Sequence, residues 1–134
     1  MFGDSPATSG THRCSVLIVE DDALLASAIG LCVEEAGYEV AGKARSVDTA
    51  LSMLAHEKVD AALLDINLRG ELVFPVANAL AERGVPFVFV TAYGRTLIPD
   101  RHRGRPVVPK PYYDAALCAA LASVLTPAPA HRAG

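Results

Sequence analysis

Short apolar runs alternate with segments of helical spacing along most of this chain of 134 residues. The apolar runs predict five strands, at residues 14–19, 38–44, 61–64, 85–90 and 107–108. The helically spaced segments predict four helices, at residues 22–36, 46–55, 75–81 and 114–125. Strands that alternate with helices favour a parallel sheet with right-handed crossovers and with helices on both faces.

This order of elements predicts an α/β domain of the flavodoxin-like, doubly wound class, with a five-stranded parallel sheet in the order 2-1-3-4-5. The run at 85–90 is apolar on both faces, so we place it in the central region of the sheet. One crossover departs from the pattern, because residues 94–105 carry few sizeable apolar side chains and two helix breakers, Pro99 and Gly104. We therefore expect a fourth helix that is short, irregular or mobile.

The composition fits one compact unit, because 51% of the residues are hydrophobic and 20% are charged. We expect a folded domain over residues 14–126, with flexible tails at 1–13 and 127–134. The formal net charge of -3 gives no general attraction to nucleic acid, and no apolar stretch reaches the roughly 20 residues of a membrane-spanning helix. Residues 1–13 lack the apolar core of a signal peptide, so we expect a cytoplasmic protein.

Three cysteines, Cys14, Cys32 and Cys118, are widely spaced along the chain. Neither a CxxC pair nor a nearby histidine accompanies them, so the spacing does not indicate a metal site. We expect each cysteine to serve as a small apolar residue in the core or at a strand edge.

Polar residues follow four of the predicted strands at their carboxyl ends, namely the pair Glu20 and Asp21, then Asp65, Thr91 and Lys110. Ligands of open parallel sheets bind beyond these strand ends, so residues far apart in sequence can meet there. Each residue alone has a simpler explanation, since acids before a helix cap it and an isolated lysine is usually solvated surface. Together they suit phosphoryl transfer, in which clustered carboxylates hold Mg²⁺ and an aspartate acts as nucleophile.

Four segments together resemble the receiver domains of bacterial two-component response regulators: VLIVEDD at 16–22, AALLDINLRGE at 61–71, FVFVTAYG at 87–94 and VVPKPY at 107–112. The resemblance implies that Asp65 is the phosphoacceptor and that Mg²⁺ binds beside it. The implied metal ligands are Asp21, Asp65 and the backbone carbonyl of Asn67, with Glu20 orienting a metal-bound water.

The same resemblance assigns the partners of Asp65 and a switch region. Thr91 and Lys110 would each bond a phosphoryl oxygen, and the Lys110–Pro111 peptide bond would be cis, as X-Pro bonds permit. The switch region would comprise Thr91, Ala92, Tyr93 and Val107. Receivers often carry an aromatic residue three positions before the lysine, whereas this chain has Val107 there, so we expect an unusual switch.

The stretch PFVFVTAYG and the weak fourth helix also resemble a subgroup of stand-alone receivers named for a Phe-Ala-Thr-Gly motif. That resemblance implies a partner histidine kinase of the HWE type. Because the chain ends soon after the last predicted helix, we expect a single-domain response regulator that docks to a partner protein or acts as a phosphate shuttle or sink. It would catalyse only its own phosphorylation and dephosphorylation, as a monomer or a weak phosphorylation-dependent dimer.

Two other functions stay open from the sequence. One is a small aspartate-nucleophile phosphohydrolase of the haloacid-dehalogenase type, although such enzymes usually carry a second aspartate where this chain has Asn67. The other is a receiver-like binding module that is never phosphorylated. A basic cluster at Arg95, 101–103 and Arg105 could meet an acidic partner, but a solvated loop explains it more simply, and we do not expect nucleic-acid binding.

Overall fold

The computed structural model of the protein describes residues 13–125, which form the predicted doubly wound α/β fold. Five parallel strands make one sheet in the order β2-β1-β3-β6-β7. They are β1 (Ser15–Val19), β2 (Glu39–Ala44), β3 (Ala61–Asp65), β6 (Phe87–Thr91) and β7 (Val107–Pro109). The predicted strand order is confirmed, since β6 and β7 are the fourth and fifth strands of this sheet along the chain. Apart from Arg13, the expected tails at 1–13 and 127–134 lie outside the described residues.

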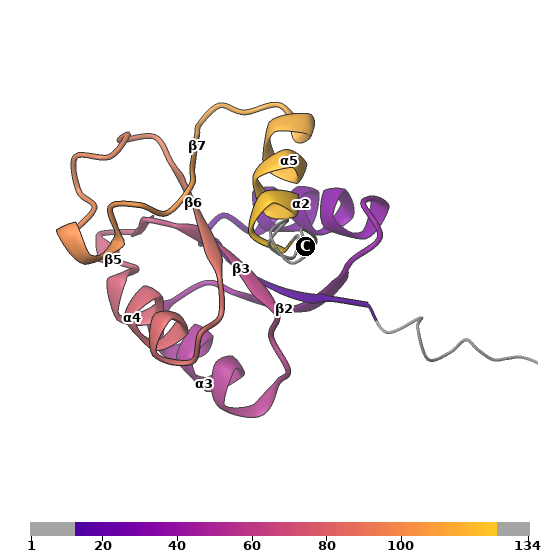
Figure 1. The fold of residues 1–134 in the computed structure, drawn as a ribbon, viewed down its shortest axis with the longest axis horizontal. Helices are drawn as coiled ribbons and strands as arrows, with labels where there is room; N and C mark the ends of the chain where they lie inside the picture. The colour runs from indigo at the N-terminus through magenta and orange to yellow at the C-terminus, as the bar shows by residue number, and fades with distance from the viewer. Residues whose placement is uncertain (1–12, 126–134) are drawn as a thin grey trace, which may run out of the picture.

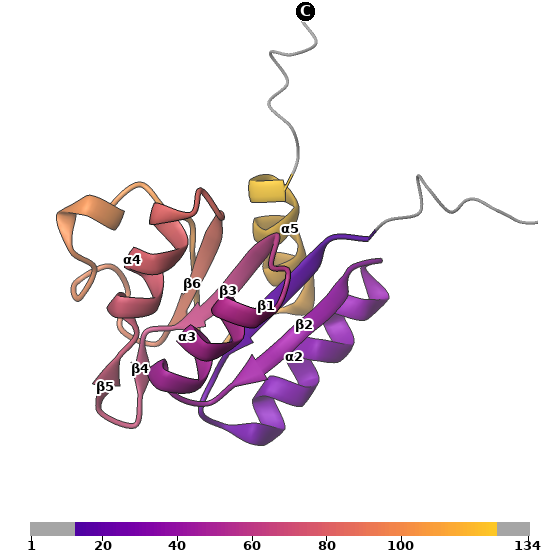
Figure 2. The same ribbon diagram turned by 90° about the horizontal axis from the view of Figure 1, so that it is seen from below.

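Four α-helices of the described region cover this sheet, namely α2 (Ala23–Glu35), α3 (Val47–His56), α4 (Phe74–Glu82) and α5 (Asp114–Leu125). Helices α2 and α5 lie side by side on one face, and α3 and α4 lie on the other (Figure 1). Figure 2 shows the same three layers from below. Between residues 13 and 125, no helix is both long enough and apolar enough to cross a membrane.

Two hydrophobic cores form, one on each face of the sheet, because successive side chains of a strand point to opposite faces. Leu17 and Leu64 point to the face that α3 and α4 cover, where Phe87 and Phe89 of β6 join them. Val16, Leu63, Val88 and Val90 are among the side chains that point to the other face, under α2 and α5. Strands β1, β3 and β6 are therefore buried on both sides, which explains their nearly continuous apolar sequences.

The helix ends follow the capping residues that the sequence carries. The Asp22 carboxylate caps α2 by accepting hydrogen bonds from the backbone N–H groups of Leu24 and Leu25. The Ser46 hydroxyl caps α3 in the same way by accepting from the N–H of Thr49. Gly37 follows α2 with a φ of 98°, a backbone conformation that favours glycine, as predicted for its helix-ending position.

The strand predicted at 85–90 is interior but not central, because β3 is the middle strand of the sheet. Strand β6 lies between β3 and β7, and it begins two residues later than predicted. The N–H of Val85 donates to the carbonyl of Leu80 and so closes α4 instead of joining the sheet. Pro86 follows without an N–H group, so regular pairing starts only at Phe87.

The connection from β6 to β7 contains no α-helix and only the short 3₁₀ turn η2 (Asp100–His102), which confirms the expected irregular fourth helix. Most of its side chains are exposed, but Ile98 and His102 are buried and attach it to the α4 side of the sheet. The imidazole Nε2 of His102 lies 2.7 Å from Oδ1 of Asn78 on α4. The buried side chains of Ile98 and His102 therefore attach this connection to the core, as the apolar face of a helix would otherwise do.

A short hairpin follows β3 that the hydrophobic pattern does not predict. Strands β4 (Asn67–Leu68) and β5 (Glu71–Leu72) pair in antiparallel fashion through a two-residue turn at Arg69 and Gly70. Both turn residues have positive φ, as tight hairpins of this length require. The Asn67 side chain accepts a hydrogen bond from the N–H of Gly70 at 2.6 Å, so it holds the turn closed.

Candidate functional site

Three carboxylates converge at the carboxyl edge of the sheet, between the ends of β1 and β3. Glu20 and Asp21 directly follow β1, and Asp65 is the last residue of β3. One carboxylate oxygen from each lies within 4.8 Å of the other two. This is the point at which the strand order reverses, where ligands of doubly wound sheets bind. Asp22 takes no part, because its carboxylate caps α2.

The donor set of this cluster fits Mg²⁺, as the sequence predicts. Mg²⁺ prefers hard oxygen ligands, few of them from the protein, with water completing its coordination. Glu20 is 2% exposed and Asp65 is 8% exposed, so their charges lie largely out of solvent. Burial, aided by the nearby charge of Asp65, raises the pKa of Glu20 to about 7, against the hydrogen bonds from Asp22 and Lys110 that lower it. A divalent cation would relieve this conflict by neutralising the carboxylates.

Lys110 places a positive charge at this cluster, next to Glu20 and Asp65. Its Nζ lies 3.1 Å from Oε1 of Glu20 and 3.3 Å from Oδ2 of Asp65. Burial lowers the pKa of Lys110, but the two carboxylates raise it more strongly, so it ends above its ordinary value. Burial likewise raises the pKa of Asp65, and Lys110 opposes that rise. The backbone N–H of Lys110 donates to the carbonyl of Thr91 at 2.9 Å, and this hydrogen bond holds the lysine beside the end of β6.

Thr91 and Asn67 flank the acidic cluster on the next strand end and on the hairpin. Thr91 ends β6, is fully buried, and its Oγ1 accepts a hydrogen bond from the N–H of Tyr93 at 2.9 Å. The backbone N–H of Asn67 donates to the Asp65 carboxylate and lowers its pKa. The structure therefore brings together Glu20, Asp21, Asp65, Asn67, Thr91 and Lys110, and the Lys110–Pro111 peptide bond is cis as expected.

The residues of the expected switch region do not form one cluster. Thr91 and Tyr93 are linked by the hydrogen bond just described, whereas the exposed ring of Tyr93 and the side chain of Ala92 lie outside the core. Val107 pairs with Phe89 in the sheet and packs against the core on the α3 and α4 side. Val107 is therefore partly buried on that face of β7, where its side chain contributes to the core packing.

Two arginines beside the cluster were not predicted from the sequence. Nε of Arg69 lies 3.3 Å from Oδ2 of Asp21, and Nε of Arg45 donates to the Asp21 carbonyl at 3.3 Å. The three residues line a small cavity of about 260 Å³. Arg69 lies four residues after Asp65 in the sequence, which is the one indication of its place near the site. The turn between β4 and β5, which the sequence pattern does not predict, directs its side chain towards Asp21.

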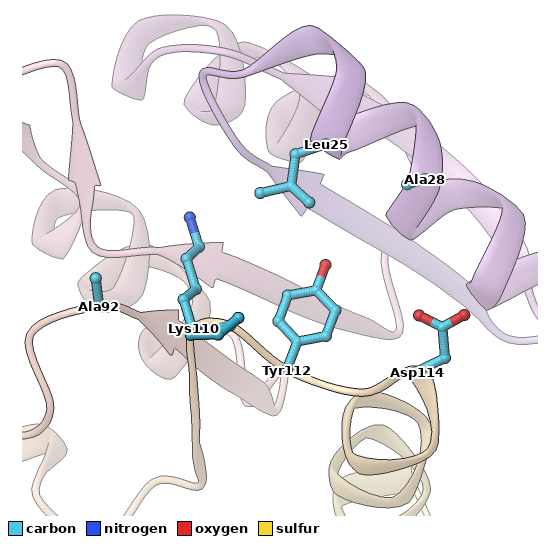
Figure 3. Close-up of a pocket in the computed structure, with 7 residues that line it drawn as sticks. Leu25, Ala28, Ala92, Lys110, Tyr112 and Asp114 are labelled. Carbon is cyan, nitrogen blue, oxygen red and sulfur yellow. The ribbon is translucent and has the colours of Figure 1, made fainter.

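A larger cavity of about 560 Å³ lies on the other side of Lys110, between α2 and the loop that connects β7 to α5. In Figure 3 the Lys110 side chain and the ring of Tyr112 rise from this loop towards Leu25 of α2. Ala28, Ala92, Pro111 and Asp114 complete the lining. Burial raises the pKa of Tyr112 to about 12, so its hydroxyl stays protonated.

The fold and the site together define an α/β protein with a carboxylate cluster and a half-buried lysine at the switch point of its sheet. Residues 16–122 match the response regulator receiver domain, and the chain belongs to this family. The resemblance read from the four sequence segments is thereby confirmed.

Solved structures of two relatives share this fold over nearly their whole length. The receiver domain of PhyR from Erythrobacter litoralis is 28% identical, with a TM-score of 0.77, over 87% of this chain and 92% of that one. SdrG from Sphingomonas melonis Fr1 is 39% identical, with a TM-score of 0.74, over 85% and 98%.

A curated relative, the transcriptional regulatory protein PdtaR of Mycobacterium tuberculosis, is 28% identical over 89 residues. That match covers 66% of this chain but 43% of the relative. The chain therefore spans less than half the length of the curated relatives that it matches.

Proposed function

We propose that this receiver accepts a phosphoryl group from a histidine kinase onto the carboxylate of Asp65, in the presence of Mg²⁺. The observation that carries the proposal is the placement of Asp65 at the end of β3, 3.3 Å from Lys110 and inside the three-carboxylate cluster. A receiver of this kind is a signalling domain and not a turnover enzyme, because the phosphoryl acceptor is one of its own side chains.

The reaction begins with one Asp65 oxygen facing the phosphorus of a phosphohistidine or an acyl phosphate. That oxygen forms the new P–O bond while the P–N or P–O bond to the donor breaks, and the donor leaves with the electron pair. Mg²⁺, held by Asp21, Asp65 and the Asn67 carbonyl with Glu20 orienting its water, would offset the charge of the phosphoryl oxygens. Lys110, whose Nζ lies 3.3 Å from Asp65, provides a second cation for those oxygens.

Thr91 connects this chemistry to the surface. Its hydroxyl oxygen now accepts from the Tyr93 N–H, and its own O–H can donate to a phosphoryl oxygen on Asp65. Drawing Thr91 towards Asp65 would pull on Tyr93 and the connection that follows it. That connection, residues 92–106, is attached mainly through Ile98 and His102, so we infer that it is the element whose position phosphorylation changes.

The partners that this function requires are a kinase and a downstream protein that docks to the receiver. The resemblance to the Phe-Ala-Thr-Gly subgroup suggests a kinase of the HWE type. SdrG, 39% identical, has also been solved in a BeF3-activated conformation, and beryllofluoride mimics a phosphoryl group on a carboxylate. PhyR from Bartonella quintana, 30% identical, is described as an anti-anti-sigma factor, which supports regulation by protein docking.

The proposal is tested by incubating the purified full chain with radiolabelled acetyl phosphate and Mg²⁺, and by counting phosphoryl groups per chain. We expect at most one acid-stable, hydroxylamine-sensitive label on the wild type and none on Asp65→Asn. The matched control is Asp22→Asn, which removes a neighbouring carboxylate but keeps a side chain that caps α2. This control should be labelled like the wild type.

Other outcomes of the same experiment would contradict the proposal. Labelling of Asp65→Asn at the wild-type rate would place the phosphoacceptor elsewhere. Continuous hydrolysis of p-nitrophenyl phosphate would instead support an aspartate-nucleophile phosphohydrolase. A folded wild type that takes no label from acetyl phosphate or from any purified kinase would support a binding module that is never phosphorylated.

A further inference from the structure

Two of the three cysteines meet on the face of the sheet that α2 and α5 cover. Cys32 lies on α2 and Cys118 lies on α5, 86 positions later in the chain. Their Sγ atoms are 3.0 Å apart, and either thiol can donate to the other. Both are free thiols in the structure. The wide spacing of the two cysteines in the sequence does not predict this contact, which arises from the packing of the two helices.

The contact is held by rigid elements and not by a loop. Helices α2 and α5 contact each other on the same face of the sheet (Figure 1). Val33 on α2 and Leu117 on α5, each a neighbour in sequence of one cysteine, are buried in the same core. The Cys32 thiol also approaches the carbonyl of Asp114 at 3.9 Å, so the two helices are in register at this point.

The two thiols differ in how open they are to a reagent. Cys32 is 5% exposed, whereas Cys118 is only partly buried. Burial and the neighbouring Cys118 raise the pKa of Cys32 to about 12, so this thiol stays protonated at neutral pH. A small oxidant therefore reaches Cys118 first, and the buried Sγ of Cys32 lies in contact with the Sγ of Cys118.

The larger cavity reaches to within one helical turn of the pair. Ala28 and Asp114 line that cavity, and each lies four residues before one of the cysteines on the same helix face. A molecule the size of a peroxide fits easily into a space of about 560 Å³. A small oxidant in the cavity beside Lys110 would therefore lie about one helical turn from the partly exposed Cys118 thiol.

We propose that Cys32 and Cys118 are a modification site that a peroxide-class oxidant converts reversibly into an intramolecular disulfide. The Cys118 thiolate attacks one peroxide oxygen, the O–O bond breaks, and a sulfenic acid and hydroxide result. The Cys32 sulfur then attacks the Cys118 sulfur, the S–S bond forms, and the displaced hydroxide leaves as water with the Cys32 proton. Overall, two thiols lose two electrons and two protons, and the peroxide becomes two waters. This inference does not depend on Asp65 chemistry.

A disulfide fits the pair better than a bound metal does. The one group of three or more metal-ligating side chains found between residues 13 and 125 is the acidic cluster, so two thiols alone would have to hold an ion. A disulfide needs no third residue, and the sulfur atoms already touch. It would join α2, which starts right after the Glu20–Asp21 pair, to α5, which follows the Lys110 loop.

The experiment uses the full chain with Cys14→Ser, so that only this pair can react. After treatment with hydrogen peroxide, denatured protein is tested with a thiol reagent and digested without reduction for mass spectrometry. We expect both thiols to be lost together, one Cys32–Cys118 linked peptide lighter by two hydrogens, and full recovery with dithiothreitol. Persistence of both thiols, a disulfide-linked dimer, or a sulfinic acid as the main product would overturn the proposal.

Two further variants and one comparison separate packing from chance reactivity. In the Cys14→Ser, Cys32→Ser variant, dimedone should trap a sulfenic acid on Cys118, while the Cys14→Ser, Cys118→Ser variant should trap little. The Cys14→Ser chain should also form the disulfide at least about tenfold faster when native than in 8 M urea, because folding holds the thiols in contact. Equal rates in the two conditions would show that the native contact has no role.

Discussion

Glu20 is the residue at which burial and charge conflict most directly. Its side chain is almost fully buried, yet it accepts hydrogen bonds from the Asp22 N–H and from Lys110 as a carboxylate would. Desolvation by burial outweighs these contacts and raises its pKa from 4.5 to about 7. In the absence of a metal, the folded protein therefore binds a proton at Glu20 more tightly than the unfolded chain does.

This conflict predicts a gain in stability when Glu20 is made neutral. For a carboxyl group whose folded pKa is raised, stability is highest below pH 4.5 and falls as the pH rises towards 7. We expect Glu20→Gln to raise the free energy of unfolding at pH 7.5 by about 1 to 3 kcal/mol, and by much less at pH 5. Urea unfolding in the presence of EDTA measures both values.

The control for this measurement is Asp22→Asn, since both substitutions remove one carboxylate from the same loop. The Asp22 variant should change the free energy of unfolding by less than about 0.5 kcal/mol at either pH, because asparagine also caps helices. A Glu20→Gln protein that is less stable than the wild type at pH 7.5 would mean that its contact with Lys110 outweighs the cost of burial.

At the residue scale, the sequence predicted the acidic cluster together with Asn67, Thr91 and Lys110, but not the two arginines beside Asp21. Composition alone does not tell which of the three consecutive acids after β1 face the site. In the structure the Asp22 carboxylate accepts the capping hydrogen bonds of α2, which leaves Glu20 and Asp21 for the site. Arg45 and Arg69 could not be assigned, because long exposed side chains leave no periodic signal. The contact between Cys32 and Cys118 depends on how two helices align, which their separate patterns do not encode.

At the element scale, the connection between β6 and β7 depends on one buried histidine. His102 packs edge-on against the rings of Phe87 and Phe89, at centroid distances of 5.6 and 6.2 Å. Arg105 covers the Phe87 ring at 4.3 Å. Within the described residues, Nδ1 of His102 has no hydrogen-bond partner, so a proton placed there would be buried without an acceptor.

This environment predicts a pH-dependent loss of stability. Burial, then the charges of Arg101 and Arg105, lower the pKa of His102 below 6.5 in the folded protein. As the pH falls through about 6.5, the unfolded chain takes up this proton and the folded protein resists it, so stability decreases. We expect thermal unfolding midpoints between pH 7.5 and pH 5.5 to fall further for the wild type than for His102→Phe.

The comparison variant for this titration is His56→Gln, which replaces an exposed histidine at the end of α3. It should keep the wild-type dependence on pH. If His102→Phe and the wild type lose stability in parallel over this range, then His102 is not the group that titrates on unfolding. Loss of folding in the phenylalanine variant at pH 7.5 would point instead to the Asn78 hydrogen bond as essential.

Element types were largely predictable because they depend on local periodicity. Strong helical spacing and good caps gave α2 and α3 nearly their observed bounds, and the absence of both gave the irregular segment 94–105. The hairpin of β4 and β5 was missed because strands of two residues are too short to show alternation. The start of β6 was misplaced because Val85 hydrogen-bonds to α4, a contact invisible in the strand's own pattern.

At the scale of the whole molecule, burial divides the protein into a protected centre and a loosely attached connection. Every residue of β1, β3 and β6 is buried, and each of these strands has a partner strand on both sides. Between Ala92 and Arg101, Ile98 is the one buried residue. Stability should therefore be distributed unevenly, with local opening of the connection far easier than opening of the sheet.

Amide hydrogen exchange followed by mass spectrometry measures this division. We expect protection factors in β1, β3 and β6 to exceed those in 93–101 by at least about a thousandfold at pH 7, because sheet amides exchange only through global unfolding. Peptides from α3 should lie in between. Comparable protection in β6 and in 93–101 would mean that the connection is an integral part of the core.

The overall topology was predictable because strand order in this class follows from right-handed crossovers on two faces, and five apolar runs were enough to place it. Apolar content alone is a weaker guide to position, since it placed the run at 85–90 in the central region of the sheet, whereas β6 is the interior strand next to β7. Sequence patterns report how deeply a strand is buried, and an interior strand next to the edge is as buried as the middle one.

The two outer strands of the sheet have a consequence for how other proteins can recognise this one. Strand β7 is three residues long and ends at Pro109, which has no N–H to offer a neighbouring strand. Strand β2 carries exposed charges at Glu39 and Lys43. Neither border is suited to extension by a strand from another chain, which guards against fibril-like stacking. Any partner must therefore recognise side chains on the helices and loops, where specificity can change without disturbing the sheet.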